Sequence, residues 1–161
     1  MKLSVPLTDK GLMPDKYSKH SEIKKAGQPV LSFPIEVSDV ADGAKYLAVS
    51  LIDYDAVPVS GSPFIHWLAA NLPVQSIAED FSRGFDGPQG MNSWYSRLDD
   101  SYVTSHYAGP NPPDKTHRYT LIVYALDHKM NLKNKFFYNE FLDELEDNIL
   151  DQGKLVINAR A

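Results

Sequence analysis

The stretch Tyr46–Asp53 (YLAVSLID) decides the fold, together with two stretches that resemble it, Phe64–Leu72 (FIHWLAANL) and Arg118–Leu126 (RYTLIVYAL). In each of them apolar residues occupy both alternating faces, which is typical of a β-strand buried on both sides. Nine Gly and eleven Pro are scattered between short apolar runs, where they favour turns. The sequence therefore predicts a mainly β fold of antiparallel strands.

Weaker patterns predict two further strands and one helix. The strands are expected at Val30–Val37 and Leu155–Ala159. The helix is expected near the C-terminus, where an apolar residue recurs every four positions and acidic residues cover the other faces. Gly153 is expected to end this helix. The residues of that repeat are Phe137, Phe141, Leu145 and Ile149.

Composition excludes several classes of protein. The 161 residues match the usual length of a single domain, so we expect residues 1–161 to form one. The net charge of −5 argues against a nucleic-acid partner, and the absence of Cys excludes disulfides and thiolate chemistry. No apolar run is long enough to cross a bilayer and no secretory signal is recognisable. A cytoplasmic protein without stable membrane insertion is expected.

The segment Ser82–Lys115 differs from the rest of the chain. It is rich in Gly, Pro and aromatic residues, and it shows no periodicity. Such long segments without regular structure are uncommon inside compact domains and often line binding sites.

Two carboxylates, Asp53 and Asp55, end the first strong strand. If the strand continues through both, they point the same way and can bind a metal, share a proton or hold a cation. Alternatively, Asp at a strand end simply starts a turn. In the next strand His66 interrupts an apolar run, where it is either a functional residue or a hydrogen-bonded core histidine, and Trp67 is expected on the opposite face.

The third strand opens with His117-Arg118-Tyr119. Here His117 and Tyr119 share one face, and an imidazole beside a phenol can donate hydrogen bonds to an oxyanion. The alternative is an ordinary exposed histidine at a strand entry. Just upstream, Asn111-Pro112-Pro113 forms a stiff loop, which by itself indicates only a rigid turn.

In this order and spacing, Asp-x-Asp-Ala after a strand, His-Trp in the next strand and a Gly-Pro-rich loop before His-Arg-Tyr resemble the phosphatidylethanolamine-binding protein family. The similarity is to its bacterial, Raf kinase inhibitor-like branch, and it is strongest from Leu31 to Leu126. It implies an antiparallel β-sandwich with one or two late helices and a small anion pocket for phosphate, acetate or a phospholipid head group.

The resemblance also implies which residues bind the ligand, and it implies no cofactor and a cis peptide at Ser62-Pro63. The loop Val57–Ile65 is longer than in common bacterial members of the family. The ligand-binding residues that it implies are Asp53, Asp55, His66, Asn111, Pro112, Pro113, His117 and Tyr119.

Three functions follow as hypotheses. The first is a non-enzymatic protein that binds a small anion, more tightly as its histidines become protonated. The second is an enzyme with a metal held by two His and a carboxylate. The third is an inhibitor of a kinase or protease that acts through surface contacts, as some members of the family do. A homodimer is possible, because bacterial relatives often form one.

Overall fold

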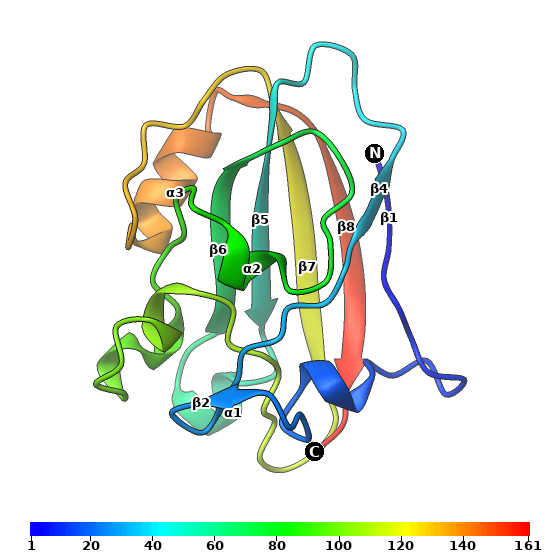
Figure 1. The fold of residues 1–161 in the computed structure, drawn as a ribbon, viewed down its shortest axis with the longest axis vertical. Helices are drawn as coiled ribbons and strands as arrows, with labels where there is room; N and C mark the ends of the chain where they lie inside the picture. Colours follow the sequence, from blue (N-terminus) through cyan, green and yellow to red (C-terminus); the bar gives the residue numbers. More distant parts are fainter.

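A sheet of four strands is the centre of the structure, a computed structural model that describes residues 1–161 (Figure 1). Its order is β6-β5-β7-β8, and every neighbouring pair is antiparallel. The bounds are β5 Tyr46–Asp53, β6 Phe64–Leu72, β7 His117–Leu126 and β8 Ile149–Ala159. The three strands predicted from two-sided burial are therefore confirmed, with β7 beginning one residue earlier than expected.

Two short antiparallel ribbons complete the β-structure. Strand β1 (Lys2–Ser4) pairs with β4 (Glu36–Ser38), and β2 (Lys24–Lys25) pairs with β3 (Gln28–Pro29). The β1-β4 ribbon lies against the edge strand β8 (Figure 1). The predicted mainly β fold with antiparallel sheets is confirmed.

Helices are few and short. They are α1 (Val57–Ser60), α2 (Phe81–Gly84) and α3 (Tyr138–Leu145), with single 3-10 turns at Asp15–Tyr17, Ser93–Ser96 and Val103–Ser105. The predicted late helix is α3, but it ends earlier than expected. Gly153 does not stop it and lies inside β8, where an added Cβ would come within 2.6 Å of Leu3 Cγ. No helix is long and apolar enough to span a bilayer.

The two weaker strand predictions differ from the structure. Of Val30–Val37 only Glu36 and Val37 pair with another strand, because Leu31, Phe33 and Ile35 pack into the core as irregular chain. The predicted Leu155–Ala159 is the second half of β8, whose first half is largely exposed and lacks a strong apolar signal.

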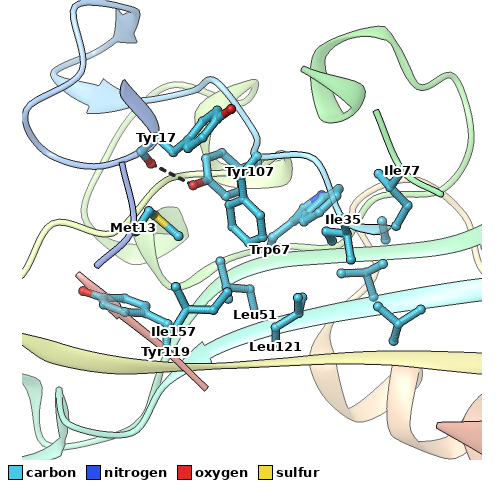
Figure 2. Close-up of a cluster of buried hydrophobic side chains, with 14 of the residues drawn as sticks. Met13, Tyr17, Ile35, Leu51, Trp67, Ile77, Tyr107, Tyr119, Leu121 and Ile157 are labelled. Carbon is cyan, nitrogen blue, oxygen red and sulfur yellow. Dashed lines mark hydrogen bonds between the residues drawn. The ribbon is translucent and has the colours of Figure 1, made fainter. Parts of the chain in front are cut away.

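The core lies on both faces of the sheet. On one face, side chains of β5, β6, β7 and β8 pack against the N-terminal segments and Tyr107 (Figure 2). There Tyr107 donates a hydrogen bond to the backbone oxygen of Tyr17, at 2.8 Å. On the other face Phe141 of α3 packs against Tyr124 and Phe136. Both faces of β5 are therefore covered, as its sequence requires.

Candidate functional site

A cavity of about 390 Å³ opens at the end of the sheet where β5 ends and β6 and β7 begin, close to α1. Its volume falls within the range of small-molecule pockets. Seven of the eight predicted ligand-binding residues line it: Asp53, His66, Asn111, Pro112, Pro113, His117 and Tyr119. Six further lining residues were not predicted: Ala56, Val59, Ser60, Phe64, Trp94 and Arg97.

Strand register explains how distant residues meet at this cavity. Asp53, the last residue of β5, pairs with Phe64 at the start of β6 and with Tyr119 in β7. His117 lies two residues before Tyr119 and therefore shares its face of the sheet. The first residues of β6 and β7 therefore lie next to the last residue of β5, at the cavity.

A β-bulge places His66 in the cavity. Trp67 pairs with Leu51 and Ile65 pairs with Ile52, so His66 is an extra residue in β6 at this step. A bulge changes the direction of a side chain without ending the strand.

The bulge brings His66 to the same face as its aromatic neighbours. The centroid of its ring lies 5.0 Å from that of Phe64 and 5.1 Å from that of Tyr119, while Trp67 packs in the core on this face. The prediction that His66 and Trp67 face opposite sides is wrong, because strict alternation fails at a bulge.

The predicted cis peptide at Ser62-Pro63 is also wrong, since every peptide bond is trans.

His66 presents one nitrogen to a ligand. Its Nδ1 lies 2.7 Å from the backbone oxygen of Ala108, which requires that Nδ1 carry the proton and donate. Burial lowers the pKa of His66, so the ring is neutral near pH 7. The remaining nitrogen, Nε2, makes no hydrogen bond within the protein and can accept one from a ligand.

His117 lies between two carboxylates. Its Nδ1 is 2.7 Å from Asp53 Oδ2, and its Nε2 is 2.9 Å from Asp114 Oδ1. Burial disfavours the charged ring, but the hydrogen bonds to Asp53 and Asp114 prevail and raise the pKa of His117. Since both nitrogens face acceptors, both carry protons and the ring is cationic.

Tyr119 carries a hydroxyl group that lacks a partner. The residue is fully buried, and its hydroxyl oxygen has no hydrogen bond although it lies in the wall of the cavity. Burial, reinforced by the negative charge of Asp53, raises the pKa of the phenol, so it stays a hydrogen-bond donor. A buried donor without an acceptor is costly, so this hydroxyl is a hydrogen-bond donor that the protein itself leaves unsatisfied.

Asp55 lies outside the cavity. Strand β5 ends at Asp53, where Asp53 Oδ1 accepts the backbone N–H of Ala56 and forms a turn, so the two carboxylates do not point the same way. Asp55 instead accepts two hydrogen bonds from the Arg118 guanidinium at the surface, at 2.8 and 2.9 Å. This contact holds the pKa of Asp55 well below its usual range. Asp53 therefore starts a turn, which was one of the two interpretations of this pair of carboxylates. Asp55 holds a cation, the guanidinium of Arg118, as the other interpretation allowed.

The outer wall of the cavity was not predicted. Val59 and Ser60 come from α1, which forms inside the long Val57–Ile65 loop and ends at Gly61 in the left-handed conformation (φ +82°). Trp94 and Arg97 come from Ser82–Lys115, which does line a cavity, as its composition indicated. The spacing of these two residues in the sequence does not relate them to the strands. The only signal for them was that the segment is rich in Gly, Pro and aromatic residues and lacks periodicity.

The cavity brings several different polar groups together. The structure contains no group of three or more His, Cys, Asp or Glu side chains placed to hold a metal ion. Instead the cavity combines a cationic imidazole paired with carboxylates, a neutral phenol and a neutral imidazole at one end of the four-stranded sheet.

An antiparallel β protein with a buried His, His, Tyr cavity between strand ends is the class defined by this fold and site. Residues 4–160 match the family model "Phosphatidylethanolamine-binding protein". The chain belongs to this family, which confirms the resemblance seen in the sequence.

Relatives and solved structures agree. YxkA of Bacillus subtilis, an uncharacterized protein, is 44% identical over 155 residues, which span 91% of this chain and 92% of YxkA. A UPF0098 protein of Methanothermobacter thermautotrophicus is 30% identical over 150 residues, 92% of this chain and 90% of that protein. The crystal structure of Chlamydia trachomatis CT736, whose description relates it to the same family, has a TM-score of 0.79 at 27% identity and covers 99% and 97% of the two chains. Escherichia coli YbcL has a TM-score of 0.76 at 21% identity, covers 99% and 98%, and supports the fold.

Proposed function

We propose that this protein is a non-enzymatic binding protein whose cavity holds a small anion, such as phosphate or the phosphate of a phospholipid head group. The observation that carries the proposal is the buried Tyr119 hydroxyl without a partner, beside the free nitrogen of His66 and the cationic ring of His117. The family description names a phospholipid with such a head group.

The chemistry of each group suits a protonated phosphate. Tyr119 can donate to one phosphate oxygen, and neutral His66 can accept the phosphate's own O–H. His117 supplies the positive charge, but both of its N–H groups already face Asp53 and Asp114, so it can donate to the phosphate only where the half-exposed Asp114 gives way. A charge-assisted hydrogen bond of this kind is about twice as strong as a neutral one. These donors act at contact range, so the net charge of −5 does not prevent binding.

The proposal is tested by Tyr119→Phe, with inorganic phosphate as the probe in isothermal titration calorimetry. The substitution removes one hydroxyl and leaves the ring, so we expect phosphate affinity to fall by about tenfold or more. Thermal stability without phosphate should stay equal or rise, because an unsatisfied buried donor is lost.

The matched control is Tyr54→Phe, which removes the hydroxyl of an exposed tyrosine outside the cavity. Its affinity for phosphate should equal that of the wild type. An absence of phosphate binding in the wild type, or equal affinity in Tyr119→Phe, would contradict the proposal.

Binding should also depend on pH through His117. Because the pKa of His117 is raised above its ordinary value of about 6.5, its charge is complete at acidic pH and is lost only as pH rises through the raised value. Sulfate is the suitable probe because it does not titrate in this range. Sulfate affinity should be highest at low pH and fall on the alkaline side, and an affinity that rises with pH would oppose the assignment.

Inhibition of a kinase or protease through surface contacts stays a prediction, and so does self-association into a homodimer.

The hypothesis of a metal-dependent enzyme is tested by metal analysis of protein purified without added metal. A stoichiometric transition metal that is lost in His66→Ala would favour this hypothesis.

A further inference from the structure

The cavity has a second set of unused hydrogen-bond donors at its outer end. The indole nitrogen of Trp94, Nε1, is buried without a partner, and Trp94 lines the cavity. An indole N–H can only donate, so the missing partner must be an acceptor atom. Trp94 and Tyr119 are the only residues in the structure with a buried side-chain polar atom that lacks a hydrogen bond, and both residues line this cavity.

Arg97 is the second outer donor. Its guanidinium makes no ion pair and only one long hydrogen bond, 3.4 Å, to the backbone oxygen of Ser93. It lies over the ring of Phe64, with the guanidinium carbon 5.1 Å from the ring centroid. A guanidinium in this position keeps most of its five N–H donors free for a carboxylate or phosphate.

These donors are held in place by the chain around them. Asn92 is buried and accepts the backbone N–H of Trp94, while its amide donates to the backbone oxygens of Val103 and His106. The hydroxyl of Ser93 accepts the backbone N–H of Ile65, which ties the turn to β6. The outer wall is thus built into the fold, and little ordering is needed when a ligand binds.

An apolar surface separates the inner and outer donors. The Phe64 ring packs against both His66 and Trp94, with 5.0 Å and 5.1 Å between the ring centroids. Pro112 and Pro113 line the same cavity. A ligand that uses both sets of donors therefore needs a short apolar body between two polar ends.

Charge gives an independent argument for the outer end. The inner end holds one cation, His117, whose charge is already paired with Asp53 and Asp114. Arg97 is the other cationic residue that lines the cavity, and no carboxylate of the protein pairs with it. A second acceptor group with a negative charge therefore gains most where it reaches Arg97.

We propose that the cavity selects phosphomonoesters whose apolar body carries a second acceptor group, such as a carboxylate, with Trp94 and Arg97 as the specificity-determining residues for that group. This inference rests on the proposed anion site, which would bind the phosphate end next to Tyr119 and His66. It goes beyond that site by requiring a ligand with two polar ends.

The experiment compares three probes by calorimetry at one pH: inorganic phosphate, phenyl phosphate and 4-carboxyphenyl phosphate. Affinity should rise along this series, and the carboxylate should add about tenfold over phenyl phosphate. Trp94→Phe and Arg97→Gln should each remove most of this added affinity and change the affinity for inorganic phosphate by less than about twofold.

Arg83→Gln is the matched control, since Arg83 is paired with Asp80 outside the cavity. It removes the same charge and should leave all three affinities unchanged. Arg97 is exposed, so Arg97→Gln gives a result even if Trp94→Phe unfolds the protein.

The outcomes separate the two proposals. If inorganic phosphate binds and depends on Tyr119, but 4-carboxyphenyl phosphate binds no better than phenyl phosphate, the two-ended ligand is wrong and the anion site stands. The same conclusion follows if Arg97→Gln weakens all three probes equally. If no probe binds, both proposals are overturned.

Discussion

His117 is the residue on which the charge of the inner cavity depends, because carboxylates occupy both of its nitrogens. The two carboxylates are not equivalent. Asp53 is buried and fixed by its turn, whereas the Asp114 side chain is about half exposed (51%) and belongs to the loop before β7. Asp114 therefore occupies the position at Nε2 that an external anion would take.

This arrangement predicts that Asp114 competes with the ligand. In Asp114→Asn the side chain no longer attracts the imidazolium as an anion, so we expect calorimetry to show phosphate binding several-fold more tightly. Asp42→Asn removes an equal charge at an exposed site outside the cavity and should have no effect. Equal or weaker binding in Asp114→Asn would show that the carboxylate supports the ligand instead.

At the scale of elements, two-sided burial made the central strands predictable, while local deviations were not. Nothing in Phe64–Leu72 marks His66 as an extra residue, because the bulge depends on register with β5. The end of β5 at Asp53 was predicted correctly, and Asp55 was assigned to the pocket only through the family resemblance, which does not show that Asp55 pairs with Arg118 at the surface. Trp94 and Arg97 escaped prediction because irregular segments have no period from which a direction can be derived.

Helix α3 gives a prediction with an internal control. Phe141 is fully buried against Tyr124 and Phe136 on the sheet face opposite Tyr119, whereas its neighbour Leu142 is largely exposed. Phe141→Ala should lower the free energy of unfolding by about 3–5 kcal/mol, and Leu142→Ala by less than about 1 kcal/mol.

Urea denaturation measures both effects. The fraction of the Phe141→Ala variant that is folded should bind phosphate with unchanged affinity, because the cavity lies at the strand ends and α3 contributes no residue to it. Similar losses of stability in the two variants would mean that α3 does not pack as described.

At the scale of the whole molecule, the contact of the β1-β4 ribbon with the sheet depends on Gly153. A side chain there would collide with Leu3, so Gly153→Val should destabilise the protein by about 1–3 kcal/mol. The gain in strand propensity from Val is at most about 1 kcal/mol and does not offset this cost.

A double-mutant cycle tests the origin of that loss. Leu3→Ala removes the colliding atoms. The double variant should therefore lose less unfolding free energy than the sum of the losses in the two single variants. Strict additivity of the two unfolding free energies would show that Gly153 is needed for another reason.

The way in which the cavity is divided between parts of the chain has a consequence for how such proteins can diversify. Its inner residues belong to strands whose register the whole sheet enforces, while Trp94, Arg97, Asn111 and both prolines come from one continuous stretch before β7. Replacement of that stretch by a homologous one would leave strand pairing intact. We therefore expect the part of the ligand preference that depends on this stretch to be exchangeable between relatives, while the cavity residues on the strands are inherited with the fold.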